Sequence, residues 1–327
     1  MKNTLISHAA QSPVVPVGRF APSPTGRMHL GNVFTALMSW LSVKSRGGRW
    51  VLRIEDLDSQ RSRREWSRLI EDDLAWIGLD WDEGGLDDRG PHGPYSQSLR
   101  GEIYLRQLAR LKGTGCTYPC TCTRADIMAT QAPHASDGRV VYGGRCRPAV
   151  MPQGACADEP VGRHSTRLWV PDNRVVEFSD RLFGPQSVNL ARECGDFILH
   201  RADGAWAYQL AVVVDDALMG INEVVRGSDL LMSAAQQIYL SELLGFKAPQ
   251  YAHVPLLCNA AGQRLSKRDR ALDMEHLRAI YTPGQLLGQL ARIGGLIDEP
   301  AECTLDDLVS LFDWNKIPAR MCVTVDY

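Results

Sequence analysis

An apolar run at residues 14–20 is followed by a loop rich in proline and glycine, and this loop leads into a helical pattern that reaches residue 45. A strand, a short loop and a helix in this order form the first part of a parallel βαβ unit. The free N–H groups at the start of such a helix, together with the helix dipole, favour an anion. His29 and Gly31 lie at that point. The feature predicts an α/β fold with a phosphate site after its first strand.

A second run near the other end of the chain carries positive charge. Arg264, Ser266 and Lys267 lie within five residues, after a strand-like segment at 251–257. Cations and a hydroxyl grouped in this way suit a polyphosphate whose charge shifts during a reaction. An ordinary helix cap and a solvated basic loop are the alternatives for the two runs. Because the chain contains neither G-x-x-x-x-G-K-[ST] nor G-x-G-x-x-G, these runs are its candidates for a nucleotide site.

Strand-like and helical patterns alternate at both ends of the chain, which predicts a parallel sheet. Strands are expected at 14–20, 49–54, 166–170, 175–179, 197–200, 212–214 and 253–257. Helices are expected at 33–45, 63–77, 99–112, 233–244, 283–293 and 304–312. The domains expected from this order are an N-terminal extension (1–16), a Rossmann-type catalytic domain (17–115 and 195–269), an inserted subdomain (116–194) and a helical C-terminal region (270–327).

Composition places the chain among ordinary globular proteins. No apolar run approaches the roughly 18 residues of a membrane span, and residues 1–16 lack the continuous apolar core of a signal peptide. We therefore expect a cytoplasmic protein that does not contact a membrane. We also expect it to be a monomer. The net charge of −2 gives no overall attraction to nucleic acid, although phosphate binding depends on local basic faces. Cysteines in that compartment are expected to be reduced, and the scattered ones to be packing residues: Cys194, Cys258, Cys303 and Cys322.

The two runs resemble, in this order, the two ATP-binding signatures of class I aminoacyl-tRNA synthetases. His29 and Gly31 match the first signature, with Asn32 in place of its second histidine, and Ser266 and Lys267 match the second. The resemblance implies that all five residues bind ATP, which enters with Mg²⁺. It also implies that His29 and Lys267 are the catalytic residues.

Four further segments, at 18–23, 53–58, 207–216 and 224–229, match the glutamate-specific branch of this class, and the match covers about residues 17–270. An acidic amino acid needs a guanidinium for its carboxylate and an anion for its ammonium, which Arg19 and Glu55 can supply. Such residues at strand ends also form structural ion pairs, and Tyr208 is equally acceptable as a core aromatic. By resemblance, the glutamate pocket consists of Arg19, Phe20, Ala21, Pro22, Ser23, Glu55, Tyr208 and Arg226.

The tail after the second signature is too short for the anticodon-binding region of a full glutamyl-tRNA synthetase, so none is expected. In this the chain resembles a family of truncated paralogues, the glutamyl-queuosine tRNA(Asp) synthetases. The resemblance implies a ligase that activates L-glutamate with ATP without needing tRNA. It then esterifies glutamate onto the cyclopentenediol of queuosine at the wobble position of tRNA(Asp).

Three other functions fit parts of the sequence. The first is a truncated glutamyl-tRNA synthetase that charges a tRNA 3′ end, which the missing anticodon region disfavours. The second is an inactive paralogue that binds tRNA or adenylate, and the retention of Arg19, His29, Glu55, Arg226 and Lys267 together disfavours it. Nucleotidyltransferases share the fold and the first signature, but they do not need a pocket of the glutamate type.

Cys120, Cys122, Tyr142 and Cys146 resemble the zinc site in the insertion of this family. Thiolates bind Zn²⁺ well, and a closed site with four ligands would stabilise a loop-rich subdomain, so its role would be structural. Tyrosine is an unusual ligand, and the 19 residues between Cys122 and Tyr142 exceed the span expected of the family. His134 and Cys116 therefore remain alternatives for the fourth ligand, and a degenerate site without metal is the other alternative.

Overall fold

The computed structural model describes residues 15–123, 125–126, 141–150, 162–259, 262–265 and 272–325. His134, Ser266 and Lys267 lie outside the described residues. Within the described part of the chain, no helix has both the length and the apolar character needed to cross a bilayer.

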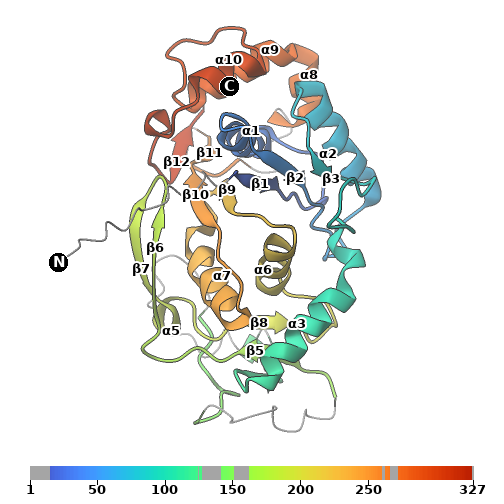
Figure 1. The fold of residues 1–327 in the computed structure, drawn as a ribbon, viewed down its shortest axis with the longest axis vertical. Helices are drawn as coiled ribbons and strands as arrows, with labels where there is room; N and C mark the ends of the chain where they lie inside the picture. Colours follow the sequence, from blue (N-terminus) through green and yellow to red (C-terminus); the bar gives the residue numbers. More distant parts are fainter. Residues whose placement is uncertain are drawn as a thin grey trace, which may run out of the picture.

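Two sets of parallel strands meet at the centre of the molecule (Figure 1). The first set is β1 (Val17–Phe20), β2 (Arg49–Leu52) and β3 (Glu83–Gly84). The second is β9 (Glu223–Gly227), β10 (Gln250–Val254) and β6 (Val175–Asp180), with β7 (Gly184–Asn189) antiparallel to β6. Asn222 links the two sets, because its backbone N–H donates to Val17 O (3.0 Å) and its Oδ1 accepts from Val17 N (2.9 Å). β1 and β9 therefore lie side by side.

Helices cover both faces of these strands. The helices are α1 (Leu30–Lys44), α2 (Arg64–Ile77), α3 (Gly101–Gly113), α5 (Leu190–Glu193), α6 (Tyr208–Leu218), α7 (Leu231–Leu244), α8 (Met274–Ile280), α9 (Pro283–Ile293) and α10 (Leu305–Leu311). One apolar core joins α1 and α2 to the C-terminal helices, and a second joins α3, α6 and α7 (Figure 1).

The order of the strands explains where a ligand can bind. β1 continues through α1 to β2 on one side, whereas β9, on the other side of β1, continues through α7 to β10. The direction of the strand order thus reverses between β1 and β9. In open parallel sheets, ligands bind outside the carboxyl ends of the strands at such a reversal. The loop after Phe20 and the turn after Arg226 both lie there.

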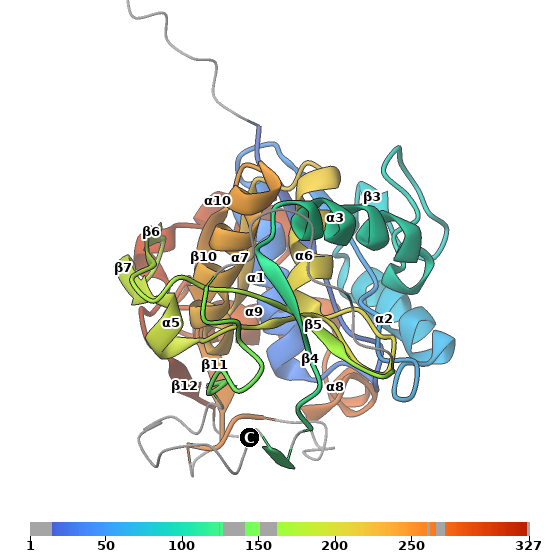
Figure 2. The same cartoon turned by 90° about the horizontal axis from the view of Figure 1, so that it is seen from below.

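The segment predicted as an insertion contributes to two sheets. β4 (Thr117–Cys120), β5 (Ser165–Leu168) and β8 (Ile198–His200) form a small antiparallel sheet, of which Figure 2 shows β4 and β5 from below. β6 instead pairs with β10, where Asp180 lies opposite Tyr251. The predicted domain limits at residues 116 and 194 stay predictions.

Most expected elements are confirmed, but the strand at 212–214 is wrong. Its three consecutive valines lie in α6, in which every residue from 210 to 216 is buried. A short apolar run cannot be distinguished from a buried helix by periodicity. The expected strand at 253–257 divides at Pro255, which has no N–H to donate. The chain continues there as β11 (Leu256–Cys258), which pairs with β12 (Cys322–Thr324).

The expectation that Cys258 and Cys322 are separate packing thiols is also wrong. The β11–β12 pairing brings their Cα atoms to 6.2 Å, and the structure joins their sulfurs in a disulfide. That separation is within the range that a disulfide spans. No sequence pattern indicates this pairing, because 64 residues separate the two cysteines.

Candidate functional site

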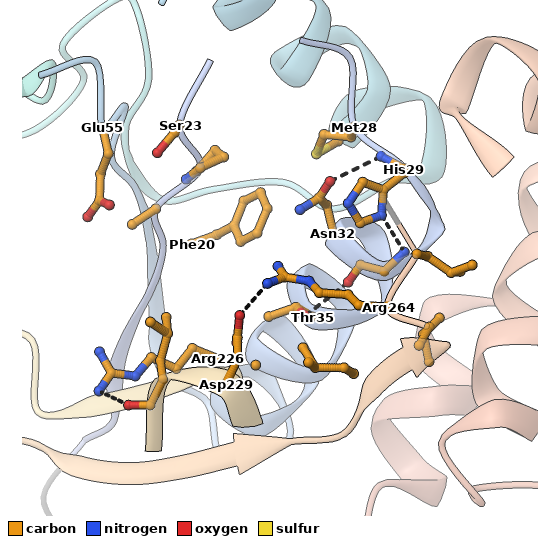
Figure 3. Close-up of a pocket in the computed structure, with 18 of the residues that line it drawn as sticks. Phe20, Ser23, Met28, His29, Asn32, Thr35, Glu55, Arg226, Asp229 and Arg264 are labelled. Carbon is orange, nitrogen blue, oxygen red and sulfur yellow. Dashed lines mark hydrogen bonds and ion pairs between the residues drawn. The ribbon is translucent and has the colours of Figure 1, made fainter. Parts of the chain in front are cut away.

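A cavity of about 670 Å³ opens at the carboxyl ends of β1 and β9. Its walls bring together the whole predicted glutamate pocket and the described part of the predicted ATP site: Arg19, Phe20, Ala21, Pro22, Ser23, His29, Gly31, Asn32, Glu55, Tyr208 and Arg226. Figure 3 shows Glu55 and Arg226 toward one end of this cavity and His29 and Asn32 toward the other. Two groups of residues that are far apart in sequence therefore share one cavity.

His29 and Asn32 close the first turn of α1. The Nδ1 atom of His29 accepts a hydrogen bond from Gly31 N (3.1 Å), and Asn32 Oδ1 accepts one from His29 N (3.1 Å). This capping box fixes the imidazole at the start of the helix, where anions are favoured. A Cβ atom on Gly31 would lie 3.1 Å from His29 Cε1, so the imidazole would have to shift by a few tenths of an ångström to admit a side chain there.

The second cationic run reaches the same cavity through Arg264 and Leu265. The guanidinium of Arg264 forms an ion pair with Asp229, which follows β9 and also lines the cavity (Figure 3). This pair attaches the beginning of the run to the cavity wall. The predicted roles of Ser266 and Lys267 stay predictions.

Arg19 is 4% exposed and lies between two acceptors. Its Nη1 donates to Val225 O (3.3 Å), and its Nε lies 3.4 Å from Asp216 Oδ1 without forming a hydrogen bond. Arg53, which is fully buried, donates to the same Asp216 oxygen at 2.7 Å and to Glu55 Oε1 at 3.2 Å. Arg53 and Asp216 thus hold Arg19 and Glu55 together at one end of the cavity.

Burial changes the acidity of two groups at this end. It raises the pKa of Glu55, although the charges of Arg53 and Arg19 act in the opposite direction. It also raises the pKa of Tyr208. A cationic ligand beside Glu55 would favour the ionised carboxylate. The site is therefore suited to a ligand that carries both an anionic and a cationic group.

Arg53, Asp216 and Asp229 were missed as functional residues, although the segments that match the glutamate branch contain all three. One feature of the sequence could have identified them. Each is a charged residue that lies at or just after the end of a buried strand, or inside a buried helix. Such a residue needs a partner, and here the partners are the pocket residues themselves.

The predicted metal ligands gather on one side of the small antiparallel sheet. The sulfur atoms of Cys120, Cys122 and Cys146 all lie within 4.8 Å of one another. The hydroxyl of Tyr142 lies 3.5 Å from Cys120 Sγ and 3.7 Å from Cys122 Sγ. The alternative that Cys116 completes the set is wrong, because it lies beyond the opposite end of β4 and its Sγ contacts Thr114 instead. His134, the other alternative, lies outside the described residues.

One thiol of this cluster is more acidic than usual, whereas burial raises the pKa of Cys122 to about 11 and also raises the pKa of Tyr142. Burial opposes ionisation of Cys146, but hydrogen bonds from Thr121, Cys122 and Tyr142 lower its pKa to about 7. The guanidinium of Arg167 lies 3.8 Å from the centre of the Tyr142 ring. Three thiols and a phenol in this arrangement form a donor set that fits Zn²⁺.

Comparisons with known proteins agree with this geometry. Residues 16–324 match the family described as tRNA synthetases class I (E and Q), catalytic domain. A glutamyl-Q tRNA(Asp) synthetase of Symbiobacterium thermophilum is 47% identical over 92% of this chain and 93% of that protein. A second one, from Nitratidesulfovibrio vulgaris, is 44% identical over 94% and 95%. The crystal structure of a glutamate-tRNA synthetase from Elizabethkingia anophelis superposes with a TM-score of 0.79 at 30% identity, covering 93% of this chain and 67% of that one.

Proposed function

Because the chain belongs to the class I tRNA synthetase family that comprises the E and Q catalytic domains, we propose that it activates L-glutamate with ATP and transfers it to queuosine in tRNA(Asp). The observation that supports this proposal most strongly is that this chain aligns with nearly the whole length of relatives named for this activity. The cavity supports the activation step, because it joins an end suited to an acidic amino acid to a helix start suited to phosphate.

In the first step, an α-carboxylate oxygen of glutamate attacks the α-phosphorus of ATP. The bond from that phosphorus to the bridging oxygen breaks, which gives glutamyl-adenylate and pyrophosphate. The protein contributes chiefly position and charge. Arg19 holds the side-chain carboxylate, and Glu55 holds the ammonium. Both groups are fixed in advance by Arg53 and Asp216, so little ordering is required when glutamate binds.

The nucleotide lies against the start of α1. His29 is held there by Gly31 and Asn32, and we place the phosphates at the N-terminal end of the helix, where anions are favoured. Mg²⁺ enters with ATP and offsets phosphate charge. Lys267 neutralises the departing pyrophosphate. In the second step, a hydroxyl of the queuosine diol attacks the activated carbonyl and AMP leaves.

The direct test is ATP-dependent transfer of labelled glutamate to purified tRNA(Asp), prepared with and without queuosine. We expect label on the queuosine-containing tRNA alone, because the diol is the acceptor. The label should be stable to removal of the tRNA 3′ end, since it lies in the anticodon loop.

Other outcomes assign other functions. Label on the 3′ end of tRNA(Glu) would identify a charging enzyme. Absence of glutamate-dependent exchange between ATP and pyrophosphate, with tRNA still bound, would identify the inactive paralogue. Either result would overturn the proposed acceptor.

Zn²⁺ is proposed to be held by Cys120, Cys122, Cys146 and Tyr142, where it would cross-link the end of β4 to the segment around residue 146. Cys122→Ser should reduce the zinc content from about one ion per chain to near zero and lower Tm by several degrees. Metal analysis and thermal unfolding measure both. Cys303→Ser is the control, because Cys303 lies outside the cluster and contacts Ala301 O. A zinc content unchanged in Cys122→Ser would contradict the assignment.

A further inference from the structure

A buried imidazole holds the second arginine of the glutamate pocket. Arg226 Nε donates to His253 Nε2 at 3.0 Å, and His253 is 0% exposed. On its other groups, Arg226 donates from Nη1 to Gln237 Oε1 (2.8 Å) and from Nη2 to Leu230 O (3.2 Å). The guanidinium is therefore fixed on several sides before any ligand arrives, and one of its acceptors is a group that titrates.

The partners of His253 define where its proton lies. Its Nδ1 is 2.7 Å from Asp180 Oδ2. Burial opposes ionisation of Asp180, but the bond to His253 and the amides of Phe183 and Leu182 lower its pKa, so the carboxylate can only accept. Arginine can only donate. Nδ1 must therefore carry the proton and Nε2 the lone pair, which is the neutral imidazole.

The surroundings of His253 favour this neutral form. Burial lowers the pKa of His253, and the charges of Arg226 and Arg19 lower it further, against the opposing effect of Asp180. The Tyr251 ring stacks on the imidazole with centroids 6.0 Å apart, and Arg226 lies over the same ring. Protonation would place a second positive charge directly against Arg226 and remove its acceptor.

We propose that Asp180 and His253 are positioning residues for glutamate: Asp180 selects the imidazole tautomer, and the imidazole orients Arg226 in the pocket. The inference rests on the proposed function, because it takes Arg226 as a glutamate ligand. Neither residue lines the cavity, so both act through Arg226.

The placement of Asp180 adds a structural consequence. Asp180 is the last residue of β6 and lies opposite Tyr251 in β10. It is 73 positions from His253 in the sequence. The β6–β7 hairpin therefore fixes the pocket arginine, although it contributes no residue to the cavity wall.

Asp180→Asn inverts this arrangement with almost no change in shape. Asp180 Oδ1 accepts from the backbone N–H groups of Leu182 and Phe183, at 3.0 Å each. These donors keep the asparagine carbonyl in the same place, so its NH₂ group faces His253 Nδ1. The imidazole proton must then move to Nε2, where it faces the N–H of Arg226. Two donors oppose each other, and Arg226 loses its fixed orientation.

The test is the kinetics of glutamate-dependent exchange between ATP and pyrophosphate in the full chain. In Asp180→Asn we expect the KM for glutamate to rise about 10- to 100-fold, with kcat and the KM for ATP little changed. Glu83→Gln is the matched control. Glu83 is another buried carboxylate that bonds an imidazole, since its Oε1 is 2.5 Å from His92 Nδ1, but it contacts no residue of the cavity. It should leave the KM for glutamate unchanged.

A second variant separates orientation from loss of stability. His253→Gln offers Arg226 a carbonyl oxygen, which accepts a hydrogen bond and has no alternative tautomer. The KM for glutamate should therefore rise less than about tenfold. In that background, Asp180→Asn should add little further effect, which makes the two changes strongly non-additive. Nitrogen NMR of labelled histidine, with the His253 signal assigned by its loss in His253→Gln, should show the proton on Nδ1 in the wild type and on Nε2 in Asp180→Asn.

Each contrary result has a distinct meaning. A wild-type proton on Nε2, additive effects, or an unchanged KM for glutamate in Asp180→Asn would overturn the positioning role while leaving the proposed function intact. A wild-type protein without glutamate-dependent exchange would overturn the proposed function and this role with it.

Discussion

Arg19→Ala is expected to lower kcat/KM for glutamate about 1,000-fold, which corresponds to about 4 kcal/mol of transition-state stabilisation. Arg19 is almost completely buried and is held by Val225 O and Asp216. Its loss removes the group that we propose binds the substrate carboxylate, and it also leaves Asp216 with one cation fewer. The measurement is glutamate-dependent exchange between ATP and pyrophosphate, and the KM for ATP should change little.

Two further variants define what Arg19 contributes. Arg19→Lys keeps the charge but cannot bind a carboxylate bidentately, so its activity should fall between those of the wild type and the alanine variant. Arg61→Ala is the control, because the Arg61 side chain is 75% exposed and forms a surface pair with Asp58. This substitution should leave kcat/KM for glutamate unchanged. If Arg19→Ala keeps the wild-type KM for glutamate, Arg19 does not bind the substrate carboxylate.

The sequence indicated the walls of the site because the chemistry is concentrated in short segments. The segment at 18–32, which runs from β1 through a loop into α1, carries Arg19, His29 and Asn32, and the structure places all three on one cavity. Local features of this kind can be recognised without a three-dimensional structure. The parallel α/β fold follows for the same reason, since its strands and helices alternate along the chain.

The supports of the site could not be predicted in the same way. Asp180, His253 and Arg226 form one network, but they come from three strands that no sequence pattern connects. The segment that forms α6 was predicted to be a strand because its three valines favour a strand locally. In the structure this segment is a helix that is buried on every side from residue 210 to residue 216. The Cys258–Cys322 pairing likewise depends on the register of two distant strands. Long-range pairing was the missing information in each case.

A network of buried charges supports one end of the cavity. Arg53, Arg100 and the two carboxylates Asp215 and Asp216 bond one another inside the fold, with Arg100 Nε 2.6 Å from Asp215 Oδ1. Buried ion pairs contribute little net stability, but removing one partner leaves an uncompensated charge. Here the network meets the cavity at Arg19 and Glu55. It therefore holds in place, before any ligand arrives, the two groups that we propose bind glutamate.

Lys267→Ala is expected to lower kcat for adenylate formation about 100- to 1,000-fold, with little change in the KM for glutamate. The reason is that charge builds on the departing pyrophosphate only in the transition state, so a cation placed there acts on kcat. Lys267 lies outside the described residues, and its proposed role rests on its place in the second signature. Single-turnover formation of glutamyl-adenylate gives the rate directly.

Arg264→Ala is the matched comparison within the same run. Arg264 lines the cavity, but its side chain is 56% exposed and its guanidinium is already paired with Asp229, so its loss should cost less than about tenfold in kcat. The difference between the two variants separates a cation that acts on the phosphates from one that anchors the loop. Equal losses would mean that the run acts through its attachment to the wall, and an unchanged rate in Lys267→Ala would remove Lys267 from the mechanism.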